Sequence, residues 1–290
     1  MALLLASDLS TATSDLVLIN LLICLLKLFI SLVMVFYAPN SSNHARSSHG
    51  SRHALGIRDV PFQLNYKVSY SPDHTQLLNR NDEIVLSIDE HSGFDLFLWQ
   101  LISQPNDDEQ RHEVDFEFLG SNTQHYLLST NVISHGNLHR EQQFALWFDP
   151  AADLHFYQIL WNRHQLVLFV DGTPIRVLKN GPSIEGIFPT KPMEIQGTIW
   201  NATWGSQGKA VNRGEGPFHA YYQGFGVDGC LTKLNNPQEC YGLNYEWNRK
   251  ELWALNQHQQ KAYEHVRRKY LTYDYCTKTS SPTPECNINY

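Results

Sequence analysis

The segment His112–Gly120 constrains the fold most strongly, because its polar and apolar residues alternate through the run of acids. Glu113, Asp115 and Glu117 fall on one face of an extended segment, and apolar residues occupy the positions between them. A period of two residues is typical of a half-buried β-strand. The apolar face can enter a core, so the other face presents three carboxylates in a row.

Carboxylates lined up on one face indicate acid–base chemistry. Like charges side by side raise one another's pKa, so one carboxyl can stay protonated beside another that is ionised. Such pairs carry out glycoside hydrolysis and transfer, and in retaining enzymes they lie about 5–5.5 Å apart. The Cα atoms of Glu113 and Glu117 are roughly 13 Å apart on an extended strand, so the side chains must converge over a curved sheet or a kinked strand. The pattern alone leaves two alternatives open, a solvated strand face and a site for a hard cation.

Further motifs resemble those of the plant xyloglucan endotransglucosylase/hydrolases of glycoside hydrolase family 16, and they occur in the matching order. These motifs are His112–Gly120, Thr130–Val132, Arg140–Gln142, Leu146–Pro150, Ile159–Asn162, Val170–Arg176, Phe188–Met193 and Tyr273–Cys276. The resemblance covers most of residues 60–290. It implies an all-β fold, a concanavalin-like β-jelly-roll sandwich with a short helical, disulfide-stapled C-terminal extension.

The same resemblance implies a function and a set of site residues. A member of this family cleaves the β-1,4-glucan backbone of xyloglucan with retention and passes the donor to a glucan acceptor or to water. By analogy Glu113 is the nucleophile, Asp115 the helper and Glu117 the general acid/base. The residues expected to bind sugar are Asn131, Arg140, Glu141, Trp200, Trp204 and Arg267.

Several of these binding residues have a plainer interpretation from the sequence alone. Asn131 is equally an amide bonded to the backbone at a strand end, and Arg140 a surface ion pair. Trp200 and Trp204 would be core residues on composition, and Arg267 belongs to a basic run that suits a solvated helix face near a C-terminus.

Composition limits the class of partner. The chain has 290 residues, of which 42% are apolar, and this is enough for one good core with room for an extension. Its net charge is −7. The negative charge argues against a nucleic-acid partner, for which a basic patch is expected. We expect no metal or organic cofactor, xyloglucan or a related β-glucan with oligosaccharide acceptors as partners, and a monomer.

Four of the five cysteines form two pairs with the same spacing, Cys230 with Cys240 and Cys276 with Cys286. Four cysteines allow three connectivities. Two local bridges are the simplest and agree with the family pattern, and free buried thiols are the alternative. Bridges predict an oxidising compartment, consistent with a secreted glycoprotein of the plant cell wall (apoplast) that carries an N-glycosylation sequon at Asn201.

The N-terminal part of the chain has a different composition. Residues 16–38 are apolar apart from Lys27 and a few polar residues, and the run is long enough to span a bilayer. We expect residues 1–38 to be a signal peptide or an uncleaved signal anchor, and residues 39–58 a linker. A sandwich over 59–228 and a transferase extension over 229–290 follow from the resemblance.

Three departures from the family pattern bear on activity. His112 stands where the family usually has Asp, and Ser129 replaces a Gln. The stretch 94–112 is shorter than in the family, which normally places further strands there. Missing interior strands expose sheet edges, so an inactive or non-catalytic glucan-binding remnant is an alternative function. A hydrolase of another β-glucan is a further one.

Overall fold

The structure is a computed structural model of the chain. It describes residues 17–21, 25–37, 60–70, 72–88, 96–103, 110–119, 126–184, 186–200, 217–231, 240–278 and 283–287.

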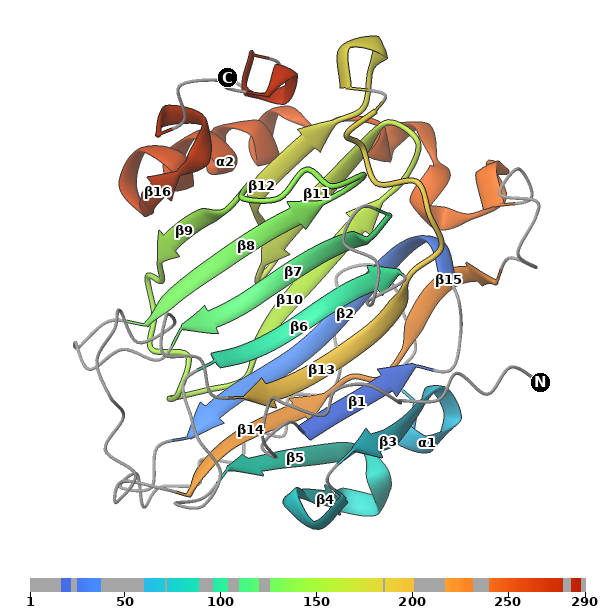
Figure 1. Cartoon of the computed structure of the whole chain (residues 1–290), viewed down its shortest axis with the longest axis vertical. Coiled ribbons are helices and arrows are strands. Elements are labelled where there is room, and N and C mark those ends of the chain that lie inside the picture. The colour runs from blue at the N-terminus through green and yellow to red at the C-terminus, as the bar shows by residue number, and fades with distance from the viewer. Residues whose placement is uncertain are drawn as a thin grey trace.

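Two antiparallel β-sheets are stacked face to face (Figure 1). The acid-bearing sheet runs β16 (Leu271–Asp274), β9 (Gln142–Ala145), β8 (Leu127–Ile133), β7 (His112–Leu119), β6 (Leu96–Ser103), β13 (Glu194–Trp200), β1 (Val17–Leu21), β3 (Tyr66–Tyr70). The opposite sheet runs β12 (Thr173–Lys179), β11 (Gln165–Val170), β10 (His155–Trp161), β2 (Leu25–Tyr37), β14 (Phe218–Gln223), β5 (Glu83–Ile88), β4 (Thr75–Leu78), with β15 (Val227–Leu231) paired to β2. This arrangement confirms the predicted all-β sandwich.

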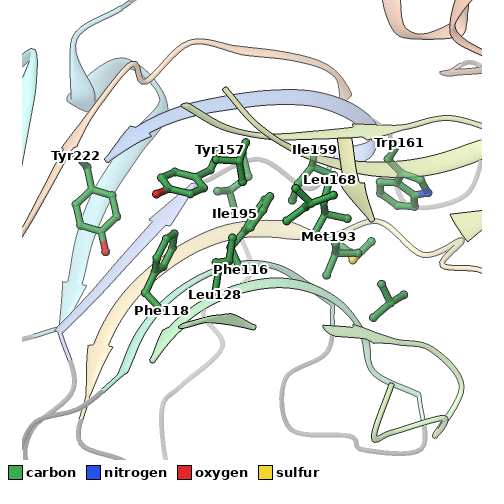
Figure 2. Close-up of a cluster of buried hydrophobic side chains, with 14 of the residues drawn as sticks. Phe116, Phe118, Leu128, Tyr157, Ile159, Trp161, Leu168, Met193, Ile195 and Tyr222 are labelled. Atoms are coloured by element: carbon green, nitrogen blue, oxygen red, sulfur yellow. The ribbon is translucent and has the colours of Figure 1, made fainter. Parts of the chain in front are cut away.

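The core between the sheets fixes which face of β7 points outward. Val114, Phe116 and Phe118 are buried in it (Figure 2). Phe118 packs edge-on against Tyr157 of β10, with ring centroids 4.7 Å apart. Burying a side chain of this size stabilises the fold by about 1.5–3 kcal/mol. The alternating positions of β7, which carry the three acids, therefore lie on the face turned away from the core.

The shortened stretch before β7 still supplies a neighbour for it. β6 pairs with β7 along its whole length, from Leu96 opposite Leu119 to Ser103 opposite His112, and pairs on its other edge with β13. β8 covers the other edge of β7. The acid-bearing strand thus has a hydrogen-bonded partner on both sides, and Glu113 itself lies opposite Ile102 of β6 and Ile133 of β8.

The apolar N-terminal segment forms strands. β1 lies between β13 and β3, and β2 lies between β10 and β14 in the middle of the opposite sheet. A continuous apolar run suits a strand in a sheet interior as well as it suits a membrane segment. In the part of the chain that the structure describes, no helix has the length and apolar character needed to cross a membrane. Cleavage of residues 1–38 as a signal peptide stays a prediction.

The described helices are short, apart from α2 (Gln257–Lys269) in the C-terminal extension. Asn256 and Gln259 cap the start of α2 reciprocally, each side chain bonding the other's backbone N–H. After α2 the chain returns as β16, which pairs with β9, so the extension adds an edge strand to the acid-bearing sheet. The other helices are α1 (Phe62–Asn65) and the 3₁₀ turns Pro72–His74, Asn79–Asn81, Pro182–Ile184, Glu246–Asn248, Lys250–Leu252, Tyr275–Thr277 and Pro284–Asn287.

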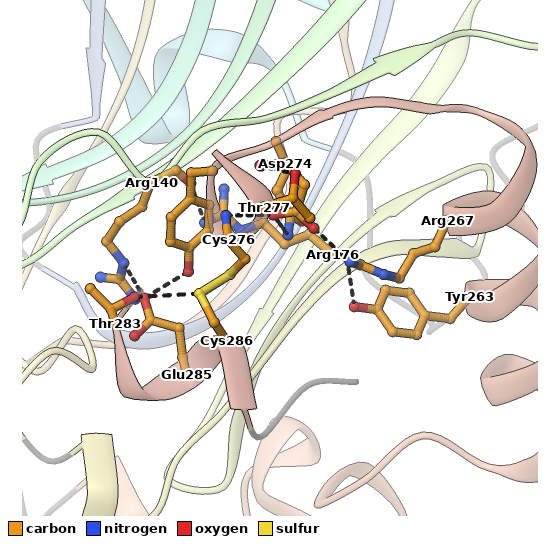
Figure 3. The surroundings of a disulfide bond; sticks show 12 residues. Arg140, Arg176, Tyr263, Arg267, Asp274, Cys276, Thr277, Thr283, Glu285 and Cys286 are labelled. Carbon is orange, nitrogen blue, oxygen red and sulfur yellow. Dashed lines mark hydrogen bonds and ion pairs between the residues drawn. A yellow bond between two sulfur atoms is a disulfide. The ribbon is translucent and has the colours of Figure 1, made fainter. Parts of the chain in front are cut away.

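Both expected disulfides are present in this extension, Cys230–Cys240 and Cys276–Cys286. The second closes the short loop after β16 (Figure 3). It holds Tyr275 and Glu285 together, and the Tyr275 hydroxyl donates to Glu285 Oε1 over 2.8 Å. The extension is therefore both helical and disulfide-stapled, as predicted.

Candidate active site

The three acids of β7 lie in the interior of the acid-bearing sheet, on its outward face. Across β8, Asp115 is opposite Asn131 and Glu117 is opposite Ser129. On the other edge, Gln100 of β6 is opposite Asp115. Residues directly opposite one another on paired strands share a face, so polar side chains flank the acids on β8.

Asp115 is the most deeply buried of the three acids, with 1% of its surface exposed. Burial raises its pKa well above the usual value, and the charges of Glu113 and Glu117 and a hydrogen bond with Glu113 raise the pKa further, against a smaller opposing effect of Arg111. These effects favour the protonated form of Asp115, whose carboxyl then donates the hydrogen bond to Glu113. That bond fixes the orientation of Glu113.

Glu113 is placed between this donor and a cation. Arg111 Nε lies 3.1 Å from Glu113 Oε2. A positive charge at this distance stabilises a carboxylate. The Glu113 side chain is thus held by the hydrogen bond with Asp115 and by the ion pair with Arg111.

Glu117 is suited to move a proton near neutrality. Burial raises its pKa to about 7, with the charges of Glu141 and Glu113 contributing, while a hydrogen bond from Ser129 and the charge of Arg176 oppose the rise. A general acid works best when its pKa is close to the working pH, because it can then both give and take a proton. The strand therefore combines an oriented carboxyl group at position 113 with one at position 117 that can hold or release a proton near neutral pH.

His112, the departure from the family pattern, is directed away from the acids. Its Nδ1 accepts from the backbone N–H groups of Thr190 and Lys191, at 3.0 and 3.3 Å. The ring proton is therefore on Nε2, which donates to Nδ1 of His135 over 2.8 Å. Burial, with the nearby charges of His135 and Lys191, lowers the pKa of His112 to about 3. A neutral His112 anchors the start of β7 to the 189–191 loop and does not disturb Glu113.

Two of the predicted sugar-binding residues lie beside the acids. Asn131 faces Asp115 across the β7–β8 pairing, and its Oδ1 accepts from the N–H of Val132 over 2.9 Å. The partly exposed Glu141 lies close enough to Glu117 to raise its pKa. Glu141 is 28% exposed, whereas Asn131 is buried, and sugar binding by either residue stays a prediction.

The two predicted arginines bond to groups of the protein itself, and their role in sugar binding stays a prediction. Arg140 is 1% exposed, its Nε lies 2.6 Å from Glu285 Oε1, and its Nη1 donates to the carbonyl oxygen of Ile187 over 3.0 Å. Arg267 donates to Asp274 Oδ2 over 2.6 Å. Figure 3 shows Arg140 directed toward Glu285 and Arg267 toward Asp274. Arg140 is therefore buried, whereas the next residue, Glu141, is partly exposed.

The predicted tryptophans lie at the end of β13. Trp200 is the last residue of the strand and is opposite Leu96 of β6. By its position in the strand register, Trp200 is on the same face of β13 as Gln196 and Thr198, the outward face. Trp204 and the sequon residue Asn201 lie outside the described residues.

Sequence reasoning missed two residues at the site. Gln196 of β13 is opposite Gln100, and therefore on the same face as Asp115, although it is two strands away. The alternation Glu194-Ile195-Gln196 was the signal that could have found it. Arg176, the last residue of the Val170–Arg176 motif, acts electrostatically on Glu117 from the opposite sheet, and no periodicity in the sequence indicates such an effect.

Among the described residues no three His, Cys, Asp or Glu side chains are grouped to hold a metal ion.

Two family models match the chain. "Glycosyl hydrolases family 16" matches residues 83–216, which include β7, and "Xyloglucan endo-transglycosylase (XET) C-terminus" matches residues 242–286.

Curated relatives match most of the chain. Xyloglucan endotransglucosylase/hydrolase protein 2 of Arabidopsis thaliana is 36% identical over 268 residues, covering 81% of this chain and 92% of the relative. Xyloglucan endotransglucosylase protein 2 of Diospyros kaki is 36% identical over 260 residues, covering 79% and 88%. A solved Bacillus licheniformis beta-glucanase is 17% identical, covers 73% of this chain and 97% of its own, and has a TM-score of 0.41, too distant a likeness to carry an argument.

Proposed function

This chain belongs to the xyloglucan endotransglucosylase/hydrolases of glycoside hydrolase family 16, retaining glycoside hydrolases and transferases, and we propose that Glu113, Asp115 and Glu117 carry out its reaction. The substrate is the β-1,4-glucan backbone of xyloglucan. The observation that supports this most directly is the division of roles along β7. Glu117 has a pKa raised to about 7, and Asp115 donates to Glu113.

The proposed reaction has two steps. Glu113 attacks the anomeric carbon of the donor glucan while Glu117 gives its proton to the departing oxygen, so a glycosyl ester forms on Glu113 and the glycosidic bond breaks. In the second step Glu117, now ionised, takes a proton from the 4-hydroxyl of an acceptor chain or from water. That oxygen attacks the anomeric carbon, Glu113 leaves as a carboxylate, and the chain is religated or hydrolysed.

Sugar binding is assigned to the face that carries the acids. Asn131 and Glu141 flank them, and Trp200 and Trp204 are proposed to stack on the glucan. The remnant alternative required a gap beside Glu113, and the pairing of β6 along β7 gives it no support. The further alternative, that the protein hydrolyses another β-glucan, is tested by assaying a panel of β-glucan substrates.

The test is incorporation of a labelled xyloglucan oligosaccharide into xyloglucan, with release of reducing ends measured in parallel. Glu113→Gln should abolish both activities. Glu264→Gln makes the same chemical change on an exposed face of α2 and should leave both unchanged. A wild-type chain that neither transfers nor hydrolyses xyloglucan would overturn the proposal, and activity on mixed-linkage glucan alone would change its substrate.

We propose further that the protein is secreted to the cell wall, acts as a monomer and carries a glycan on Asn201. The two disulfides support an oxidising compartment. Wall fractionation of the expressed full chain, its elution volume in size-exclusion chromatography, and a glycosidase-sensitive mass that Asn201→Gln removes would test these three statements.

A further inference from the structure

Arg176 is a buried cation that joins the two sheets behind the acids. It belongs to β12 of the opposite sheet and is 3% exposed. Its Nη1 donates to the carbonyl oxygen of Thr130 over 2.7 Å and to the Thr130 hydroxyl over 3.2 Å, and its Nη2 donates to the carbonyl oxygen of Arg140 over 2.6 Å. The guanidinium thus reaches across the core to the backbone of β8 and of the segment that leads into β9.

Arg176 bonds to β8 at the point where the pairing of β8 with β9 ends. The described pairing of β9 with β8 runs from Leu127 to Thr130 and stops there. A carbonyl at such a point needs another donor, and Arg176 supplies it. Thr130 stands between the two β8 residues that flank the acids: Ser129, hydrogen-bonded to Glu117, and Asn131, opposite Asp115.

The charge of Arg176 is not cancelled by a close carboxylate. Among the described residues none forms an ion pair with it; its guanidinium lies 5.9 Å from the ring of Tyr275. The charged groups that act on it electrostatically are Arg140, Asp274 and Glu285. Its positive charge also acts on Glu117, where it opposes the effect of burial on the pKa. Figure 3 shows Arg176 in the same buried group as Arg140 and Asp274.

We propose that Arg176 is a positioning residue for the general acid Glu117: it fixes the β8 backbone that presents Ser129 and supplies a buried positive charge behind the site. The inference rests on the proposed function, since it gives Glu117 its role. Arg176 touches neither substrate nor reacting atoms. A buried arginine that only tied the sheets together would change stability and leave the chemistry of each folded molecule as it was.

The test compares Arg176→Met and Arg176→Lys with Val177→Ala. Val177 is the next residue on β12, is buried among a different set of apolar side chains, and its truncation weakens packing without touching Thr130. Activity is measured per folded molecule as kcat and KM for xyloglucan. The titration of Glu117 is measured by NMR of ¹³C-labelled carboxyl groups, a readout that needs no turnover.

Arg176→Met should lower kcat by about tenfold or more with KM within about twofold, the pattern of an interaction made in the transition state. It should also raise the pKa of Glu117, because a neighbouring cation favours the ionised form. Arg176→Lys keeps the charge, so it should leave the pKa of Glu117 near the wild-type value and lose less of kcat. Val177→Ala should lower Tm and change neither quantity.

The proposal is overturned if Arg176→Met, or Arg176→Lys should the first variant not fold, matches Val177→Ala in kcat per folded molecule. A pKa of Glu117 that is equal in Arg176→Met and Val177→Ala overturns it as well. If the wild-type chain is inactive, the proposed function fails by itself, and the titration of Glu117 still decides between a charge that acts on this carboxyl and a purely structural arginine.

Discussion

Replacing Arg140 by Met tests whether this arginine supports the fold or binds sugar. Both Arg140 and Glu285 are 1% exposed, and Nε lies 2.6 Å from Oε1. Met keeps most of the side-chain volume and removes the charge, so it leaves the Glu285 carboxylate buried with only neutral side-chain donors, the Tyr275 hydroxyl at 2.8 Å and the Thr283 hydroxyl. Removing one partner of a buried pair costs about 3–5 kcal/mol, because the other charge stays desolvated.

The double variant Arg140→Met/Glu285→Leu should recover most of that loss, since an apolar pair of similar volume carries no buried charge. The assay is guanidinium unfolding of the four proteins in the cycle, with the coupling energy taken from the four midpoints and slopes. Arg249→Met is the matched control, because Arg249 and its partner Glu246 are both more than half exposed and the loss should stay below about 1 kcal/mol.

The reasoning is refuted if Arg140→Met unfolds within about 1 kcal/mol of the wild type. A KM for xyloglucan raised about tenfold in the same protein would show instead that the guanidinium reaches the substrate, as the family resemblance implied, since a rise in KM alone marks lost binding.

Three further predictions follow from other parts of the molecule. The kcat/KM for transfer should fall as the pH rises through about 7, because Glu117 must carry a proton to protonate the leaving group; a profile that stays flat from pH 6 to about pH 9 would contradict the role of Glu117. The contribution of His112 to stability should shrink as the pH drops from 6.5 towards 3, because the unfolded state takes up a proton on this ring at its ordinary pKa of 6.5 and the folded state only at about 3, while Glu117, with its pKa raised to about 7, acts in the opposite direction; the difference in unfolding free energy between the wild type and His112→Gln should therefore shrink over this range in urea unfolding at a series of pH values. A chain that begins at residue 39 lacks β1 and β2 and should show no cooperative thermal transition by circular dichroism, whereas a sharp transition would show that neither strand is needed.

The strand that carries the acids was predictable because its pattern is local. Alternation over residues 112–119 determines both the strand and the outward face of Glu113, whatever its neighbours are. The cysteine pairs were predictable for a similar reason, since each bridge closes a short loop. The contrast between Arg140 and Glu141 was not predictable, because both residues precede β9 and the burial of Arg140 depends on contacts with Ile187 and Glu285, far along the chain.

The location of the N-terminal apolar run in the sheets could not be predicted from the sequence either. A run of this kind fits a signal segment, a membrane span or an interior strand, and composition does not separate the three. The structure gives it a place in the opposite sheet because β10 and β14 offer it two edges, one on each side. Both edges belong to segments that occur much later in the chain, so no local pattern records the match.

The position of β2 also has a consequence for biosynthesis. The ribosome releases this strand near the beginning of translation, but the first of its partners starts at His155 and the last ends at Leu231. Pairing across such sequence separations is slow, and an apolar strand that stays unpaired during this time is prone to aggregate. A chaperone or the translocation machinery must therefore shelter residues 25–37 until most of the polypeptide has emerged, and the time at which that shelter is released decides whether the sandwich closes.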